Sequence, residues 1–421
     1  MENHIKHPLL FLLCAATIVS KSAQLESSHV NLYSPSYIAQ PQDFPNQQLY
    51  RAYVAIQRFK NTISCDPRNI ITTWVGPDIC GEKSYRGFYC TAFPSMHGTN
   101  LTVTAIDFKG FGLCAPKLQG LIDHLPDLEV LQASSNNLSG GIPRLNSLPE
   151  YSLDDDSSPE QFCGGRVCIY GRIANIRAKV FCRMYNPSNI LQEAVKVPGA
   201  MDGKALLVSN NKLSGALPAE LAFFKMNYLA VANNKLSGPI PQSFGHLQDS
   251  LVEMLLLNNQ LSGCLPHEVG MLHKASVIDA GMNQLTGPIP SSFSCLSSVE
   301  QLNLAGNRLY GDVPDAVCKL AGTAGRLANL TLSGNYFTSV GPACAVLIKD
   351  GVLDVKNNCI PGLANQRRPA ECAAFQSQPK TCPAATTQVT CPAAAATNAA
   401  AAGERKARDY SSYVTYATLH Q

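Results

Sequence analysis

Several features are missing from this 421-residue chain, and each absence excludes a class of protein. No stretch of sequence reaches the roughly 18 to 20 consecutive apolar residues that a transmembrane helix needs, so we expect no membrane span. The formal net charge is only +3, which is too small to create a whole-protein field for nucleic acid. We therefore expect neither a nucleic acid nor a lipid bilayer as a partner.

Motifs for catalysis and metal binding are missing as well. The nine histidines are scattered, without a paired acid and nucleophile at motif spacing, and no phosphate-binding loop occurs. The sequence has no CxxC motif and no paired-histidine spacing, which argues against a zinc site. The sequence thus predicts a protein that is not an enzyme and that uses no metal and no cofactor.

What the chain does contain is a short phrase that returns at a nearly constant interval. It reads NNKLSGALP from Asn210, NNKLSGPIP from Asn233 and NNQLSGCLP from Asn258. The asparagine two residues before the leucine or phenylalanine recurs at 211, 234, 259, 283, 307 and 335, at intervals of 23, 25, 24, 24 and 28 residues. Such a regular period predicts a solenoid.

Each repeat can be interpreted as one coil of that solenoid. Leu302 and Leu304 alternate inward on a short strand, Asn307 turns the chain, and Leu309 points inward again. No coil can bury its own leucines, so neighbouring coils stack and their strands pair. The unit LxxLxLxxNxLxGxIP resembles the plant-type leucine-rich repeat. We therefore predict an α/β solenoid, a right-handed superhelix with a concave parallel β-sheet, in which the repeated asparagines satisfy backbone groups.

The N-terminus and the cysteines predict an extracellular protein. Lys6 is followed by an apolar run from Leu9 to Val19 and by small residues, the layout of a secretory signal cleaved near Ser22. Sixteen cysteines include Cys14 in this signal, which leaves an odd number in an oxidising compartment. One thiol is therefore free or pairs between chains, and the second alternative would give a disulfide-linked homodimer.

The other cysteines predict disulfide caps at both ends of the solenoid. Cys80 and Cys90 are a pair by proximity, and Cys65 with Cys114 is a second candidate pair. The six cysteines from Cys318 to Cys391 allow 15 connectivities and are left unassigned.

These observations divide the chain into segments. We expect a signal peptide at 1–22, a flexible extension at 23–48, a cysteine-containing cap at 49–98, the solenoid at 99–345, a second cap at 346–375 and a disordered Ala/Thr-rich tail at 376–421. The stretch at about 150–200 breaks the repeat pattern, and it is either an inserted loop or a set of strongly degenerate coils.

Two segments that flank the repeats carry a family resemblance. YVAIQRFKNTISCDPRNIITTWVGPDICGEKSYRGFYC at 53–90 and NNCIPGLANQRRPAEC at 357–372 resemble the N-terminal half of plant leucine-rich repeat extensins. The resemblance implies a protein of the plant cell wall or apoplast that binds small basic secreted peptides of the rapid alkalinization factor class and can be dimeric. No Ser-Pro runs follow Cys391, so the chain resembles relatives that lack the extensin tail.

The repeat pattern also predicts which side chains face a ligand. On the concave face we expect an exposed apolar patch with two acids and two amides beside it, and such patches usually mark binding sites. The predicted ligand-binding residues are Leu207, Tyr228, Glu253, Leu255, Leu257, Val277, Asp279, Gln301 and Asn303. An alternative left open by the sequence is that the irregular stretch at 150–200 folds across this face and buries it.

Three N-glycosylation sequons are present, at Asn100, Asn137 and Asn329. Asn329 falls on the concave face, so a glycan there would confine a ligand to coils 205–305. The sequence thus predicts a secreted binding protein whose partner is a small basic signalling peptide. The alternative is a protein inhibitor of a cell-wall-degrading enzyme, similar to plant polygalacturonase inhibitors.

Overall fold

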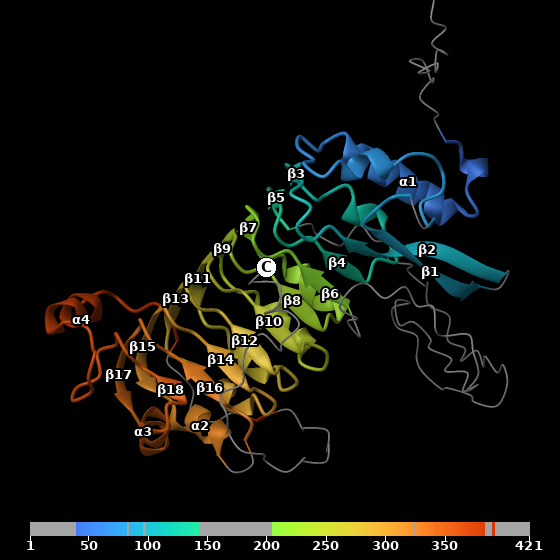
Figure 1. Cartoon of the computed structure of the whole chain (residues 1–421). Helices are drawn as coiled ribbons and strands as arrows, with labels where there is room; N and C mark the ends of the chain where they lie inside the picture. Colours follow the sequence, from blue (N-terminus) through green and yellow to red (C-terminus); the bar gives the residue numbers. More distant parts are fainter. Residues whose placement is uncertain are drawn as a thin grey trace, which may run out of the picture. The chain divides into compact units, whose positions relative to one another are not determined.

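The strands of successive coils pair into two sheets that run along the chain. The computed structural model describes residues 39–81, 84–95, 98–142, 204–322, 325–383 and 390–391. Within them a ten-stranded sheet has the order β1-β2-β4-β6-β8-β10-β12-β14-β16-β18 (Figure 1). Its strands are β1 (Phe88–Ser95), β2 (Gly98–Asp107), β4 (Val130–Gln132), β6 (Ala205–Leu207), β8 (Tyr228–Ala230), β10 (Glu253–Leu255), β12 (Val277–Asp279), β14 (Gln301–Asn303), β16 (Asn329–Thr331) and β18 (Leu353–Asp354). The β1–β2 pair is antiparallel, whereas the later pairs are parallel, as the repeat predicts.

A second set of strands follows the repeated asparagines. A six-stranded sheet has the order β17-β15-β13-β11-β9-β7, and β3 pairs separately with β5. These strands are β3 (Cys114–Ala115), β5 (Asn137–Leu138), β7 (Ser214–Ala216), β9 (Lys235–Gly238), β11 (Gln260–Cys264), β13 (Gln284–Gly287), β15 (Arg308–Val313) and β17 (Tyr336–Val340). Each coil therefore contributes one strand to each of two ladders.

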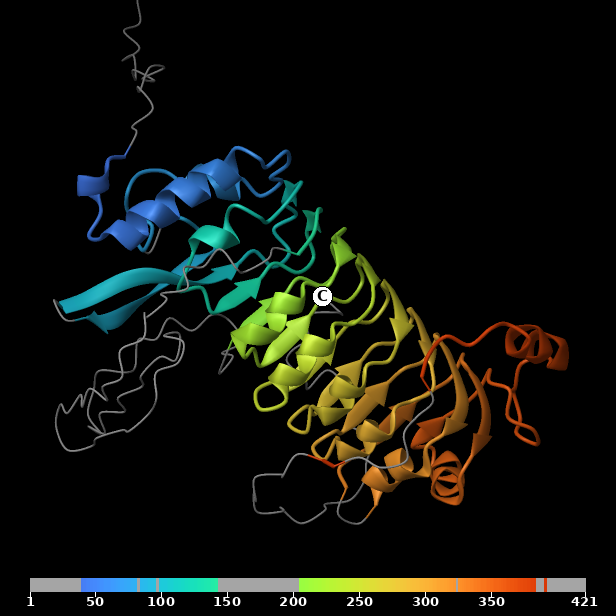
Figure 2. The same cartoon turned by 180° about the vertical axis from the view of Figure 1, so that it is seen from behind.

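Short helices return the chain from one coil to the next, on the side opposite the ten-stranded sheet (Figure 2). The 3-10 helices are η1 (Pro41–Asp43), η2 (Ile70–Thr73), η3 (Ile122–His124), η5 (Ala219–Phe224), η6 (Gln242–Leu247), η7 (His267–Met271), η8 (Ser291–Cys295) and η9 (Lys319–Ala321). The α-helices are α1 (Gln47–Lys60), α2 (Asp315–Cys318), α3 (Pro342–Lys349) and α4 (Pro369–Gln376). A proline precedes each of η5, η6, η7 and η8, because its restricted φ suits the residue before a helical turn.

The repeated asparagines join each coil to the one before it. Asn259 accepts a hydrogen bond from the backbone N–H of Leu236 at 3.0 Å. Its Nδ2 donates to the carbonyls of Val231 in the preceding coil and Leu256 in its own coil, both at 3.0 Å. The same pattern of accepted and donated bonds recurs at Asn136, Asn211, Asn234, Asn283, Asn307, Asn335 and Asn358. The structural role predicted for these residues is confirmed. Asn358 extends the series of asparagine contacts one coil past the predicted solenoid boundary at 345.

The first asparagine of each Asn-Asn pair has a different structural role, which is to form the turn. Asn210, Asn233 and Asn258 all have positive φ, at 57°, 55° and 53°. Asparagine tolerates this left-handed conformation because its short side chain bonds locally. Asn233 donates to Asn210 at 2.7 Å, and Asn258 donates to Asn233 at 2.9 Å. One asparagine of the pair thus shapes the turn, and the other joins the coils.

The N-terminal cap covers the first coil with helix α1. Asn46 caps the helix by accepting from the N–H of Leu49 at 2.8 Å. Trp74 is fully buried and contacts the rings of Phe59 and Phe108 at centroid distances of 6.4 and 5.5 Å. The aromatic cluster closes the open end of the core, as the sequence predicts for a cap.

The prediction of a flexible extension up to residue 48 is wrong for its last part. Residues 41–43 form η1, and α1 begins at Gln47. Phe44 is buried because its ring packs against Tyr50 at 5.5 Å and Tyr53 at 5.2 Å. The cap therefore begins before Phe44, while residues 1–38, with the predicted signal peptide, lie outside the described part.

The irregular stretch at about 150–200 interrupts the repeat pattern in the sequence, but the strands on either side of it are paired with each other. β4 pairs directly with β6, with Gln132 opposite Leu207. The backbone N–H of Leu138 donates to Asn211 at 3.1 Å, so the coils on either side of the gap are neighbours. Of the two alternatives, an insertion between adjacent coils is correct, and degenerate coils stacked between them are excluded.

Disulfides close both ends of the solenoid. The predicted bonds Cys65–Cys114 and Cys80–Cys90 are both present. At the other end, bonds link Cys318 to Cys344 and Cys359 to Cys372.

Two further disulfides hold the C-terminal segment against the middle of the solenoid. Cys382 is bonded to Cys264 in β11, and Cys391 is bonded to Cys295 in η8. Before these bonds, the ring of Phe375 stacks on Tyr336 at 3.7 Å between centroids. The prediction that the tail is disordered from residue 376 is therefore wrong for 376–383 and 390–391, because covalent bonds and ring stacking position these residues.

The repeated asparagines give a prediction about stability. Replacing Asn283 with alanine should lower the free energy of unfolding by about 3 kcal/mol, because it leaves the buried N–H of Leu261 without a partner and removes the hydrogen bonds that Asn283 donates to the carbonyls of Leu256 and Ala280. Equilibrium urea unfolding followed by circular dichroism measures this. The neighbouring exposed variant Gln284→Ala is the control and should change the value by less than about 0.5 kcal/mol. Equal stability of the two variants would contradict the role of the ladder.

Prediction from the C-terminal disulfides. The bond between Cys264 and Cys382 closes a loop with a sequence separation of 118, against 10 for Cys80 and Cys90. Because a longer loop restricts the unfolded chain more, Cys264→Ser/Cys382→Ser should cost about 2 kcal/mol more than Cys80→Ser/Cys90→Ser. Urea unfolding of the two double variants makes the comparison, and a smaller loss for the first variant would show that the long-range bond adds little.

Candidate functional site

The sequence predicts that a ligand binds on the face of the ten-stranded sheet that points away from the core. Alternate residues of each strand point to opposite faces. Leu206, Leu229 and Met254 belong to the main core, which runs through the solenoid. Ala205, Leu207, Ala230, Leu255 and Val277 belong to a second cluster. We call the face that carries this second cluster the outer sheet face.

The predicted ligand-binding residues lie together on the outer sheet face. Strand pairing places Glu253 beside Tyr228 and Val277, and places Leu255 beside Asp279. Gln301 and Asn303 follow on the next strand, opposite Val277 and Asp279. The predicted positions therefore form one contiguous surface across β6 to β14.

The prediction that this surface is solvent-exposed is wrong. Leu207, Leu255 and Val277 are all 0% exposed. Tyr228 and Leu257 are half-buried and pack against the same cluster. These side chains are therefore covered rather than open to a ligand. The sequence left such a self-covered face open as an alternative, although the stretch at 150–200 that it suggested as the cover lies outside the described residues.

Two carboxylates lie beside the apolar cluster. Glu253 is 4% exposed and Asp279 is 2% exposed. The Oδ1 atom of Asp279 accepts from the N–H of Gly281 at 3.0 Å, and Asn303 accepts from Ala305 in the same way at 3.0 Å. Position 303 thus shows that a neutral amide can replace the acid without loss of this local bond.

The N-terminal part of the outer sheet face is polar, and sequence reasoning did not select its residues as a site. Gln132 is 7% exposed, while Ser134 and Ser209 are 0% exposed. On the strand before them, Asp107 accepts from the N–H of Lys109 at 2.9 Å, and burial raises the pKa of its carboxyl. Only burial distinguishes these residues, and no sequence pattern indicates it.

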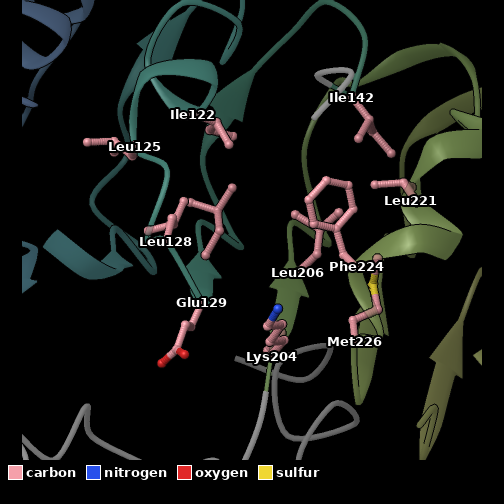
Figure 3. Close-up of a pocket in the computed structure, with 12 residues that line it drawn as sticks. Ile122, Leu125, Leu128, Glu129, Ile142, Lys204, Leu206, Leu221, Phe224 and Met226 are labelled. Carbon is pink, nitrogen blue, oxygen red and sulfur yellow. The ribbon is translucent and has the colours of Figure 1, made fainter. Parts of the chain in front are cut away.

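An apolar cavity of about 60 Å³ lies beside this polar region, where the insertion leaves the solenoid (Figure 3). Ile122 and Leu125 line one side and Leu221 and Phe224 the other. We assign no ligand to this cavity.

Other predicted features have less structural support. Asn329 lies in β16 on the outer sheet face, where its Oδ1 accepts from Thr331 at 3.0 Å, and Asn137 lies in β5 and donates to Cys114. Glycosylation of these two residues and of Asn100 in β2 stays a prediction. Across the described ranges, no helix is both long and apolar enough to cross a bilayer, and no cluster of three or more His, Cys, Asp or Glu side chains is placed to hold a metal.

Comparison with known families and sequences identifies the repeat. The family model "Leucine Rich Repeat" matches residues 225–247 and 298–320. Leucine-rich repeat extensin-like protein 1 of Arabidopsis thaliana is 36% identical over 100 residues, which are 24% of this chain and 13% of the relative. Pollen-specific leucine-rich repeat extensin-like protein 1 of the same plant is 37% identical over 97 residues, which are 22% of this chain and 9% of the relative. The resemblance to extensin-like proteins is confirmed over this part, and the match spans only a small fraction of those relatives.

Solved structures with similar coils come from plants. The ectodomain of the Arabidopsis thaliana receptor kinase GASSHO1/SCHENGEN3, in complex with CASPARIAN STRIP INTEGRITY FACTOR 2, has a TM-score of 0.49 and 23% identity, covering 73% of this chain and 33% of the receptor chain. A plant ice-binding protein has a TM-score of 0.39 and 17% identity, covering 76% of this chain and 98% of its own. Neither similarity is close enough to support an argument about function.

Prediction from the insertion. Replacing residues 143–203 with the residues at 241–251, which connect two regular coils, should give a folded protein with the same six described disulfides, because β4 already pairs with β6. Circular dichroism and disulfide mapping test this. Binding of the dye ANS reports on the cover of the outer sheet face, and increased fluorescence of the folded variant would assign that cover to the insertion. Failure to secrete a folded protein, beside a wild-type control, would show that the insertion is needed for the fold.

Proposed function

We propose that this leucine-rich repeat protein is an extracellular protein of the plant cell wall or apoplast that binds a small basic peptide on its outer sheet face. The observation that carries the proposal is the charge of that face. Glu253 and Asp279 stand on adjacent strands beside apolar side chains of the same face. Such a surface is complementary to a peptide that combines basic and apolar residues.

Burial of the face sets a condition on binding. Leu255 and Val277 are covered by the chain itself, so a peptide reaches them by replacing contacts that the free protein already makes. The free energy needed to replace these contacts lowers the observed affinity for the peptide, because only the binding-competent fraction of the protein takes up ligand. We therefore expect the affinity to rise in any variant that loosens the cover.

The extracellular location rests on different observations. The six disulfides between described residues are typical of an oxidising compartment, and the chain begins with the pattern of a secretory signal. The similarity to extensin-like proteins over about a quarter of the chain points the same way. Fractionation of plant tissue that produces the protein, followed by mass spectrometry of its N-terminus, tests both location and cleavage.

Prediction from the two acids. In calorimetric titration with a panel of basic apoplastic peptides, Glu253→Gln/Asp279→Asn should weaken binding by about 100-fold, because two charge-assisted contacts are lost. Asparagine at 279 keeps the local bond, as Asn303 shows. The matched control is Asp249→Asn/Asp350→Asn, which removes two exposed charges elsewhere and should leave the affinity within about twofold.

Two results would count against this proposal. A failure of the folded wild-type protein to bind any peptide of the panel would remove peptide binding as its function. Binding that weakens equally in the two double variants would show that net charge, rather than the outer sheet face, attracts the peptide.

A further inference from the structure

At the N-terminal end of the outer sheet face, on β4 and β6 and the residues that follow them, three buried polar side chains each have one atom without a hydrogen-bond partner. They are the Oε1 of Gln132 and the hydroxyl oxygens of Ser134 and Ser209. The three residues are 7%, 0% and 0% exposed. Buried polar groups in proteins nearly always have a partner, and the exceptions need an explanation. Three exceptions on two paired strands indicate a place for a ligand group.

The three side chains come from two paired strands. Gln132 at the end of β4 lies opposite Leu207 at the end of β6. Two residues later the chains are still bonded, since the N–H of Ser135 donates to the carbonyl of Ser209 at 3.0 Å. Residues two apart on a strand share a face, and neighbouring strands lie about 4.8 Å apart. The two hydroxyls and the amide oxygen are therefore within reach of one small polar group.

The charges around this cluster balance. On β2, Asp107 pairs in register with Gln132, and Lys109 lies in the turn that directly follows β2, where its backbone N–H donates to Asp107. One carboxylate and one ammonium group thus border the cluster on one side, and buried Leu207 borders it on the other. A neutral ligand group suits this environment better than an ion.

The available atoms define the chemistry of that group. The amide oxygen of Gln132 only accepts hydrogen bonds, whereas each serine hydroxyl both donates and accepts. The matching ligand group needs an N–H donor and a carbonyl acceptor close together. A peptide main-chain amide is such a group, and an extended chain offers one at every residue.

We propose that Gln132, Ser134 and Ser209 form a subsite that binds main-chain amide groups of an extended peptide. This inference rests on the proposed function and adds a second point of attachment to it. The subsite on β4 lies three strand spacings, about 14 Å, from the acid on β10, which is about four residues of extended chain. The peptide would place its apolar residues over Leu207 and Leu255 between the two points.

Saturation-transfer NMR with the full-length protein tests the subsite on a neutral probe. The probe is acetyl-Gly-Leu-Gly-Gly-amide, and its partner has the three glycines replaced by N-methylglycine, which removes their N–H donors. We expect a transfer signal for the first probe with wild-type protein. We expect that signal to fall at least fivefold for the methylated probe and for Ser134→Ala/Ser209→Ala.

A stability measurement separates ligand binding from a structural role. Because the two hydroxyl oxygens have no partner in the described protein, Ser134→Ala/Ser209→Ala should not lower Tm. The control Ser237→Ala/Ser262→Ala, on strands of the second sheet, should leave the probe signal unchanged. A lowered Tm together with an unchanged probe signal would make the serines structural and overturn the inference.

Other outcomes also decide between the proposals. Saturation transfer to cellobiose but not to the peptide probe would make this a carbohydrate site and overturn the inference. If basic peptides bind through Glu253 and Asp279 while the serine variants have no effect, the subsite fails alone. If neither set of variants affects peptide binding, the proposed function fails as well.

Discussion

One asparagine side chain shared between two coils is the contact on which the rest of the structure depends. Each of these amides accepts a backbone N–H from the preceding coil and donates to carbonyls of both coils, as Asn259 does with Leu236, Val231 and Leu256. The turn would otherwise leave these buried groups unsatisfied, so a single coil is unstable alone. Stacking in register then aligns the strands, and their alternation divides the apolar residues into a core and an outer sheet face.

Because each coil needs only its neighbours, the architecture tolerates a large interruption. The series of asparagine contacts continues directly from Asn136 to Asn211, although the whole insertion separates Ile142 from Lys204 in the sequence. Each coil of a solenoid is stabilised by contacts with its nearest neighbours. An insertion between two coils therefore leaves the structure of the coils on either side intact. The same property leaves the ends open, and aromatic packing at one end and disulfides at both ends close them.

The outer sheet face shows how function depends on more than the repeat. Its middle is apolar with two acids, and its N-terminal part has polar groups that lack partners. These regions are adjacent because strands of successive coils are adjacent, although Gln132 and Leu207 are separated by the whole insertion in the sequence. A ligand that spans both regions would be bound through its charge in the middle of the face and through main-chain hydrogen bonds at the N-terminal part.

The sequence by itself determined the period, the inward and outward positions of each strand, the structural role of the asparagines and the disulfides Cys65–Cys114 and Cys80–Cys90. These features follow from local spacing, because side-chain direction alternates residue by residue. Only the tertiary structure decided that the coils flanking the insertion are neighbours, that Cys382 bonds to Cys264 and that Leu255 is covered. Those contacts join residues far apart in the chain, and a local pattern carries no information on which distant segments meet.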